Sequence, residues 1–543
     1  MTAARVRLCV PASLDAPVAS ALRRGADVQL AASPVADPSA VVFAPAGPAP
    51  GRERQSLHDA LAAAAAALSG VDRAIVVSSA AIYGASPYAP GFVDESWETP
   101  PTHPNRIVEW WRAFEREIAR IVPAARLTVL RPAPLLDGES YVSRLLRAPA
   151  AVTLSGHDPS IQLLAVDDLA SAIACALGRE ARGVYNVAPA GVIPLGAALR
   201  MASRVRIPLP RAWQRAARAP LAAAGAAWPI DQVDFIRYGA TISGDRIARE
   251  LGFVPSRSSA RALAEFVDPR HGHADGHTMF DPFGQDKRYI DAYGRTLFTL
   301  LCRYYWRIEC AGIESLPAAG RAVLAGPHRG FMPFDGVMLL HLAVRGRGRY
   351  VRFLIHPSLV KFPFLFNFMT KLGGIPACRE NADWVLQQDE IVGIFPEGIQ
   401  GAFTPYRAAY RLGKFGRDEF VKAALRNRAP IVPFATVGSA EIFPILARIR
   451  WPWWERFTDW PYFPITPTFP LAPVPLPSKW HVRFLPPLHV EDAYPPEAAD
   501  DPAAVRQISR EVRGMIQAAL DEMLARRRWI FFGSIFNGRH GTV

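Results

Sequence analysis

The sequence predicts an α/β protein of two domains, the first of which is built on a doubly wound parallel sheet. The chain has 543 residues, which is more than one ordinary hydrophobic core accommodates. Half of the residues (50%) are hydrophobic, as expected for a globular protein. Short β-like runs alternate with helical stretches in both halves of the chain, and this alternation is typical of parallel strands covered by helices.

In the first third of the chain, short apolar runs rich in Val, Ile and Leu are separated by helical stretches. The expected strands are residues 6–10, 41–44, 74–77 and 127–130, and the expected helices include residues 57–68 and 110–121. Strands connected by helices in this way pair in parallel and bury both faces of their sheet. We therefore expect a first domain over residues 1–267.

A polar stretch over residues 268–288 is expected to link the two domains. It contains His271, His273 and His277 among Gly, Asp and Pro residues. Three histidines can bind a metal ion, but a flexible His-rich connector is the interpretation that we favour. The sequence therefore predicts no metal site.

The second domain is expected over residues 289–543. It begins with an aromatic-rich helix over residues 293–308, and β and α signals then alternate from residue 322 to about residue 437. Residues 448–487 follow, with several Trp and many Pro among Arg and Lys. Because Pro interrupts regular elements, we expect a Trp-rich loop in this segment.

Charge and cysteine content limit the classes of partner and compartment. Lys and Arg number 62 against 49 Asp and Glu, a net charge of +13, which favours phospholipid headgroups or nucleic acid as partners. No helix-turn-helix, zinc-finger or RNA-recognition signature is present, so nucleic acid is not predicted. The five cysteines are scattered without a C-x-x-C spacing, which indicates neither disulfides nor a zinc site and favours a reducing cytoplasm.

Contact with a membrane is expected to be peripheral, on the inner face of the cytoplasmic membrane. No run of about 18 uncharged apolar residues is present, so no helix should span a bilayer. The apolar run after Arg7 is short and is followed by Asp15, unlike a signal peptide. Aromatic and basic residues that favour the headgroup region mix in residues 297–306, 448–463 and 526–532.

Four stretches of the first half carry motifs of a known family. They are residues 76–84 (VVSSAAIYG), 130–132 (LRP), 164–170 (LAVDDLA) and 183–187 (GVYNV). Together they resemble the extended short-chain dehydrogenase/reductase family, the NAD-dependent epimerase and dehydratase group. The resemblance implies a Rossmann-like fold, in which Ser79 matches the active-site Ser.

The first half departs from that family where its chemistry takes place. Glycines normally follow the first strand and let the backbone approach the pyrophosphate, but residues 11–15 contain none. The family's Tyr-x-x-x-Lys pair falls at about Ile107 and Trp111, and neither side chain transfers a proton. We therefore expect a degenerate domain kept for structure, regulation or docking, without NAD(P). A working reductase, or a nucleotide held by a remodelled loop, is the alternative.

In the second half, His328 and Asp335 lie in the segment AGPHRGFMPFDG, residues 325–336, after a β-like run. His328 is expected at the strand end and Asp335 at the start of the next helix, within reach of each other. Such a His can take the proton of an acceptor hydroxyl while the carboxylate fixes its tautomer. An activated acyl thioester needs little beyond positioning and oxyanion stabilisation. A structural His at a strand end is the alternative for this pair alone.

Further blocks follow in order: residues 372–382 (LGGIPACRENA), 394–398 (IFPEG), 413–417 (GKFGR) and 429–434 (APIVPF). In this order and spacing, across about residues 293 to 490, they resemble the lysophospholipid acyltransferase superfamily, the glycerolipid acyltransferases. The resemblance implies an α/β acyltransferase fold and an O-acyltransferase activity like that of 1-acylglycerol-3-phosphate O-acyltransferase.

The resemblance also implies site residues and partners. His328 and Asp335 match the catalytic pair, and the residues expected to bind substrate are Arg329, Arg379, Phe395, Pro396, Glu397 and Gly398. Arg379 would bind a phosphate or headgroup through its guanidinium, and a surface ion pair is the alternative for it. The implied partners are acyl-CoA or acyl carrier protein (ACP) as thioester donor, a lysophospholipid or glyceride acceptor, and an anionic membrane surface. No tightly bound cofactor is implied.

One departure leaves the acceptor open. Six residues separate His328 from Asp335, whereas the commonest pattern of the superfamily has four, and the longer spacing resembles the branch of monoacylglycerol and diacylglycerol acyltransferases. The acceptor is then lysophosphatidic acid, another lysophospholipid, a neutral glyceride or a long-chain alcohol. Two other functions stay open: an NAD(P)-dependent reductase or epimerase acting on a lipid precursor, and a non-catalytic lipid-bound scaffold.

Overall fold

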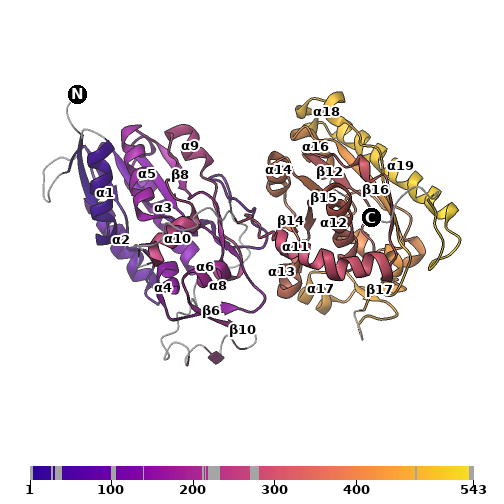
Figure 1. Ribbon diagram of the computed structural model, residues 1–543. Helices are drawn as coiled ribbons and strands as arrows, with labels where there is room; N and C mark the ends of the chain where they lie inside the picture. Colours follow the sequence, from indigo (N-terminus) through magenta and orange to yellow (C-terminus); the bar gives the residue numbers. More distant parts are fainter. Residues whose placement is uncertain are drawn as a thin grey trace. The chain divides into compact units, whose positions relative to one another are not determined.

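The computed structural model of the chain divides into two compact units, residues 1–284 and 285–543 (Figure 1). The residues that it describes are 4–25, 28–30, 39–49, 51–98, 105–137, 140–210, 213, 216, 217, 220, 233–268, 280–416, 418–470 and 474–536. Both units are α/β, as the sequence predicts. His271, His273 and His277 of the predicted linker lie outside the described residues.

The first unit is built on a six-stranded sheet with the strand order β2-β1-β3-β4-β5-β8. Its strands are β1 (Ala4–Cys9), β2 (Val28–Leu30), β3 (Ala40–Phe43), β4 (Ala74–Val77), β5 (Leu127–Pro132) and β8 (Gly183–Val187). Every neighbouring pair is parallel. Because β2 lies on one side of β1 and the later strands lie on the other, the sheet is doubly wound, and the predicted Rossmann-like fold is confirmed.

Helices cover this sheet and bury strands that are apolar on both faces. All four residues of β3 and of β4 are buried. The helices α1 (Ala12–Gly25) and α5 (Val166–Gly178) pack together, and α2 (Glu53–Leu68) packs with α3 (Arg106–Ile121). Smaller elements complete the unit: α4 (Tyr141–Arg147), α6 (Leu195–Met201), α8 (Val233–Arg237), α9 (Asp245–Leu251), α10 (Ser259–Val267), and the two-stranded sheets β6–β10 (Ala150–Leu154, Val205–Leu209) and β7–β9 (Ser160–Ile161, Ile193–Pro194).

The second unit contains a seven-stranded sheet with the order β11-β19-β16-β12-β15-β13-β14. Its strands are β11 (Glu309–Ala311), β12 (Ala322–Ala325), β13 (Val351–Ile355), β14 (Ile375–Pro376), β15 (Ile391–Ile394), β16 (Ile431–Val437) and β19 (His481–Phe484). Only the β16–β19 pair among these is antiparallel. The strand β12 lies near the middle, so its carboxyl end is flanked by β15 and β16, which is where ligands bind in open α/β sheets.

The second unit opens with a helix that starts earlier than the sequence predicts. It runs as α11 (Lys287–Tyr293) and continues through π-helical turns over Gly294–Phe298 and Leu301–Tyr305. The side chain of Asp286 accepts a hydrogen bond from the Tyr289 amide, so this acid caps the helix. One side of the helix enters the core with Phe298 and Cys302, and the other side is exposed.

The remaining helices of the second unit surround its sheet. They are α12 (Phe334–Arg347), α13 (Pro363–Lys371), α14 (Arg379–Gln387), α15 (Gly398–Ala402), α16 (Glu419–Arg426), α17 (Pro452–Thr458), α18 (Val490–Ala493) and α19 (Pro502–Arg526). The helix α12 is buried along most of its length, and α19 packs along β16. Within the described ranges, no helix has both the length and the apolar composition needed to cross a membrane.

The expectation of an irregular Trp-rich loop after residue 448 is wrong. The chain there forms β17 (Ala447–Ile449), α17 and β18 (Phe463–Ile465), with β17 and β18 paired antiparallel. Pro452 occupies the first turn of α17. Because the amide of the first helical residue has no partner within the helix, Pro begins this helix instead of interrupting it.

Candidate active site

A close fit between strand and core fixes where His328 emerges. All four residues of β12 are fully buried, and the chain leaves the sheet at Gly326. A Cβ atom at Gly326 would lie 2.5 Å from the ring of Phe434, so only glycine fits. Gly330 has a φ of +74°, which favours glycine and turns the chain toward α12. His328 is therefore presented at the carboxyl edge of the sheet.

His328 and Asp335 meet as the sequence predicts. The Nδ1 atom of His328 lies 2.7 Å from Oδ2 of Asp335. The same carboxylate accepts hydrogen bonds from the amides of Arg329 (3.0 Å) and Gly336 (2.8 Å). Asp335 lies in the first turn of α12, where the helix dipole favours negative charge. Three contacts therefore fix this buried carboxylate with Oδ2 toward the ring.

The imidazole of His328 is oriented by stacking as well as by hydrogen bonding. Its ring lies 4.7 Å from that of Phe395, at an interplanar angle of 29°, and Phe395 in turn stacks on Phe353 at 5.4 Å. The side chain of His328 is 16% exposed. Across the part of the chain that the structure describes, Nε2 has no hydrogen-bond partner. Nε2 is therefore the nitrogen left for a substrate.

Arg329 and Glu397 form a buried ion pair next to His328. The two Arg329 Nη atoms lie 2.6 and 3.3 Å from the Glu397 carboxylate oxygens. The guanidinium also donates to the carbonyls of His328, Ala409 and Arg411. With this bidentate contact and three carbonyl acceptors, the charge of Arg329 is compensated within the protein.

Glu397 connects this pair to the loop after α15. Its Oε1 accepts a hydrogen bond of 2.7 Å from the amide of Gly413. The same loop is held from outside by α19, because Arg513 donates to the carbonyls of Leu412 and Gly413, and Gln517 accepts from the amide of Leu412. Glu397 thus connects the ends of β12 and β15 to this loop, and α19 holds the other side of the loop.

Five of the six residues predicted to bind substrate lie beside His328, and the sixth, Arg379, lies at the start of α14. Phe395 lies against His328, and Pro396 and Gly398 complete the turn that carries Glu397. Arg329 and Glu397 contact each other and protein carbonyls or amides, so both donors and acceptors are largely used inside the fold. This pairing follows because a buried charge in a low-dielectric interior is stable only when paired. Contact of Arg329 and Glu397 with substrate stays a prediction.

Arg379 lies apart from this group. It begins α14 after β14, and two strands, β13 and β15, separate β14 from β12. At a spacing of about 4.8 Å per strand, the axes of β14 and β12 are ~14 Å apart. The side chain of Arg379 is 61% exposed and lies 3.6 Å from Asp383, which also pairs with Arg426 at 3.0 Å.

A second buried acid near the site was not predicted from the sequence. Glu441 accepts from the Tyr410 hydroxyl at 2.6 Å and from Arg527 at 2.6 Å. It belongs to the turn whose Ser439 carbonyl would lie 3.4 Å from a Cβ atom on Gly330. The sequence signal that could have found Glu441 is an acid within an apolar run, here GSAEIFPI, as for Glu397 in IFPEG. A carboxylate buried in such a run needs partners.

In the first unit, the carboxyl edge of the sheet is occupied by a different polar cluster. Arg131 pairs with Glu115 at 2.7 and 3.0 Å and donates to the Tyr83 hydroxyl at 2.7 Å. The hydroxyl of Ser78 donates to Glu115, and the hydroxyl of Tyr83 donates to Asn186. Burial raises the pKa of Tyr83 to about 12, so this phenol stays protonated at neutral pH.

A Rossmann-like fold implies a dinucleotide, which would lie at the turn between β1 and α1. Pro11 precedes α1 and lacks an amide hydrogen, and its carbonyl accepts from the amides of Leu14 and Asp15. Asp15 lies in the first turn of α1, where its negative charge opposes a pyrophosphate. Ile107 and Trp111 are buried apolar side chains of α3. These residues do not fit the group, and no reaction step is derived through it.

Among the described residues, one group of side chains is close enough to share a metal ion. It consists of His489, Glu491 and Asp492 at the start of α18, with ligand atoms within 4.8 Å of one another. Two of the three are exposed, and Glu491 already lies 2.9 Å from His489. Exposed acidic groups of this kind occur without a metal, so we assign no metal role to them.

Comparison with known proteins identifies the class of the second unit. The family described as Acyltransferase matches residues 307–437, from β11 to β16, and this range includes His328 and Asp335. Phytyl ester synthase 2 (chloroplastic) of Arabidopsis thaliana is 28% identical over 141 residues, 25% of this chain and 20% of that protein. The second unit is an acyltransferase domain, and the prediction of acyl transfer is confirmed at this level.

Longer matches come from mycobacteria. An uncharacterized protein of Mycobacterium leprae (strain TN) is 40% identical over 279 residues, 50% of this chain and 74% of that protein. An uncharacterized protein of Mycobacterium tuberculosis (strain ATCC 25618 / H37Rv) is 39% identical over 279 residues, 76% of its length. The chain belongs to one family with these proteins and joins a Rossmann-like unit to an acyltransferase unit.

Solved structures match about half of the chain at low identity. A human epimerase family protein with NADPH is 18% identical, covers 48% of this chain and 99% of its own, and has a TM-score of 0.37. MoeE5 in complex with UDP-glucuronic acid and NAD is 18% identical, covers 49% of this chain and 97% of its own, and has a TM-score of 0.36. Both matches are too weak to indicate a ligand for this chain.

The buried ion pair predicts a measurable asymmetry in stability. Glu397→Gln leaves the charge of Arg329 buried without its counter-ion, so we expect it to lower the free energy of unfolding by about 3–5 kcal/mol in urea denaturation. Glu419→Gln is the matched control, because Glu419 forms an exposed pair with Lys422 at 3.2 Å and its loss should cost less than about 1 kcal/mol. Equal effects of the two substitutions would contradict the burial of the pair.

Proposed function

We propose that the second unit transfers a fatty acyl group from acyl-CoA or acyl-ACP to a lipid hydroxyl, with His328 as general base and Asp335 as its partner. The observation that carries this proposal is the 2.7 Å contact between His328 Nδ1 and Asp335 Oδ2. It lies in the domain matched by the Acyltransferase family and leaves Nε2 without a partner among the described residues.

The reaction follows from that arrangement. Nε2 of His328 removes the proton of the acceptor hydroxyl while the oxygen attacks the thioester carbonyl carbon. The tetrahedral intermediate then collapses, the carbon–sulfur bond breaks, and the imidazolium returns the proton to the leaving thiolate. The products are an ester and a free thiol, and no oxidant, reductant or metal ion enters the balance.

Asp335 acts in this scheme through the imidazole. Its ionised oxygen accepts the Nδ1 hydrogen, which keeps the lone pair on Nε2, and its negative charge stabilises the imidazolium that forms. The amides of Arg329 and Gly336 fix the carboxylate in place. The buried pair of Arg329 and Glu397 holds the backbone around His328, so we assign both of these residues a positioning role.

For the acceptor, the placement of Arg329 and Arg379 favours an uncharged lipid hydroxyl, as in a glyceride or a long-chain alcohol. Arg329 is neutralised by Glu397, and Arg379 starts from a strand ~14 Å from β12 at ordinary strand spacing. A lysophosphatidate carries its phosphate within a few bonds of the hydroxyl. The name of the relative phytyl ester synthase 2 denotes an ester of an alcohol. A lysophospholipid acceptor is the competing candidate.

We propose that the protein works as a peripheral protein on the inner face of the cytoplasmic membrane, where its acceptor is dissolved. Its net charge of +13 favours an anionic lipid surface. Nucleic acid is not a proposed partner.

For the first unit, we propose a structural or docking role without NAD(P). The carboxyl edge of its sheet is filled by the pair of Arg131 and Glu115, and the turn after β1 carries Pro11 and Asp15 where a pyrophosphate needs free amides. A reductase or epimerase on a lipid precursor is the competing function.

The catalytic assignment predicts a large loss of turnover. His328→Ala removes the base and should lower kcat by about 10²- to 10⁴-fold in an assay with radiolabelled acyl-CoA. Asp335→Asn should have an effect of similar size, because the amide carries no negative charge to stabilise the imidazolium, and its NH2 group, if turned toward the ring, would favour the wrong tautomer of His328.

The control for both variants is His489→Ala, which removes an exposed imidazole and should change kcat by less than about twofold. A non-catalytic scaffold predicts no turnover in the wild type either. Turnover of Asp335→Asn at the wild-type rate would remove Asp335 from the mechanism.

The acceptor is tested with a panel of long-chain alcohols, mono- and diglycerides and lysophospholipids. We expect ester formation with the uncharged acceptors, and Arg379→Ala should change their KM by less than about twofold, because these acceptors carry no phosphate for a guanidinium to bind. Turnover restricted to lysophosphatidate, with a KM raised about tenfold or more by Arg379→Ala, would show instead that Arg379 binds the phosphate.

The proposal for the first unit is tested by isothermal titration calorimetry of the full chain with NAD⁺ and NADPH. We expect no saturable binding at ~1 mM nucleotide, because the turn after β1 has no glycine and places Asp15 in the first turn of α1, where its charge opposes a pyrophosphate. Saturable binding in the micromolar range would support the reductase or epimerase alternative.

A further inference from the structure

Between β16 and β19, the chain forms a face of exposed apolar side chains. Every residue from 446 to 453 is exposed, which is uncommon for residues of this hydrophobicity. The exposed fraction of the side chain reaches 57% at Trp453 and 61% at Phe457. We define the α17 face as Leu446, Arg448, Ile449, Arg450, Trp451, Trp453, Arg456 and Phe457.

The rings of the α17 face are held in fixed positions. Trp453 and Phe457 stack at 5.5 Å with an interplanar angle of 3°, and Trp451 lies 5.4 Å from Trp453. Trp451 also contacts Phe463 of β18 at 5.8 Å. A cluster of exposed rings of this kind marks an interaction site.

The charges around these rings are mainly positive. Arg448, Arg450 and Arg456 are exposed, against the exposed acid Glu455. Arginines next to Trp and Phe complement a layer of anionic headgroups, because the rings enter the boundary of the acyl chains while the guanidinium groups stay with the phosphates. The occupant that fits this combination is an anionic lipid bilayer.

A continuous series of ring contacts connects the α17 face to the catalytic turn. Phe463 lies 4.9 Å from Trp454, and Trp454 lies 5.9 Å from Trp460. Trp460 lies 5.9 Å from Phe331, three residues after His328. The α17 face is thus packed, ring on ring, against the segment that carries His328.

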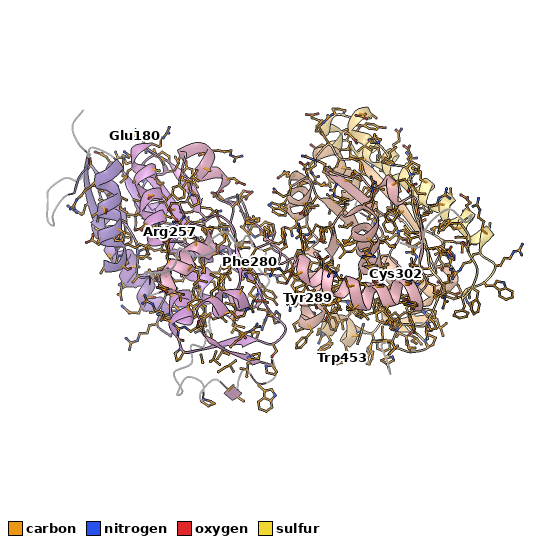
Figure 2. The ribbon with its side chains drawn as sticks, viewed as in Figure 1. Glu180, Arg257, Phe280, Tyr289, Cys302 and Trp453 are labelled. Atoms are coloured by element: carbon orange, nitrogen blue, oxygen red, sulfur yellow. The ribbon has the colours of Figure 1, made fainter. Side chains whose placement is uncertain are left out.

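A second link joins the face to the turn of Glu397. Arg448 donates to the carbonyl of Phe403, at the end of α15, and α15 begins directly after Glu397. Figure 1 shows α17 and β17 at one end of the second unit, away from α16 and α18, and Figure 2 shows Trp453 at the outer edge of that end.

We propose that the α17 face docks on an anionic bilayer and sets the site of His328 at the lipid surface from which the acceptor enters. The second part of this statement rests on the proposed acyl transfer. The first part concerns binding alone and holds or fails independently of it.

Docking is measured by cosedimentation of the full chain with vesicles of phosphatidylcholine containing about one third phosphatidylglycerol. The triple variant Trp451→Ala, Trp453→Ala, Phe457→Ala should bind at least about tenfold more weakly, and Arg450→Glu with Arg456→Glu should do the same. The charge variant alters only exposed side chains, so it still tests vesicle binding if the triple variant fails to fold.

The matched control is Trp529→Ala, Phe531→Ala, Phe532→Ala in the segment after α19. These aromatic side chains are also exposed, with Trp529 at 69%, and Arg528 lies beside them in the sequence. Residues 526–532 carry the same mixture of aromatic and basic residues, so they are the competing docking surface. Because the proposal assigns docking to the α17 face, this variant should keep most of the binding. Loss of binding in the control with retention in both α17 variants would overturn the proposal.

Activity separates this proposal from the proposed function. The α17 variants should lose turnover on vesicle-embedded acceptor and keep it within about twofold on a short-chain acceptor in solution. If the wild type transfers no acyl group, the acyl-transfer proposal fails while vesicle binding still tests docking. Binding that is independent of phosphatidylglycerol, or variants that dissociate an oligomer without changing vesicle binding, would overturn docking on a bilayer.

Discussion

The buried ion pair of Arg329 and Glu397 is the interaction on which the arrangement of the second unit depends. It joins the ends of the neighbouring strands β12 and β15, and the amide of Arg329 also donates to Asp335. Arg329 therefore contacts both acids of the site: its backbone amide holds Asp335, the partner of His328, and its side chain holds Glu397. Because unpaired charge is costly in the interior, the two turns are stable only when they meet in this one arrangement.

The two units use the same edge of their sheets in different ways. In both, the carboxyl ends of parallel strands bring together side chains from distant parts of the sequence. In the first unit, Arg131 and Glu115 satisfy each other there, with Tyr83 as a further partner. In the second unit, the ion pair lies behind His328, and Nε2 has no hydrogen-bond partner among the residues described. The presence of one nitrogen available for proton transfer distinguishes the two edges.

The proposed transfer of an acyl group to a lipid needs both a rigid polar centre and an apolar surface. Phe395 and Phe353 fix one side of His328, and Phe331 begins the ring contacts that lead outward to α17. Packed rings of this kind exclude water. Because interiors are close-packed, a displacement of one ring is felt by the rings that it contacts. The proposed docking face and the proposed catalytic centre are thus parts of one packed cluster.

The sequence by itself determined the class of both folds and the His328–Asp335 pair, because strand periodicity and ordered blocks are local signals. It did not place Arg329, Arg379 or Glu441, nor the helix at Pro452, since these depend on which strands become neighbours and which ends are buried. Contacts such as Arg329 with Glu397 join positions 68 residues apart. The tertiary structure alone decides which residues form such pairs, because a buried charge is stable only next to an opposite charge, and folding determines which one lies close enough.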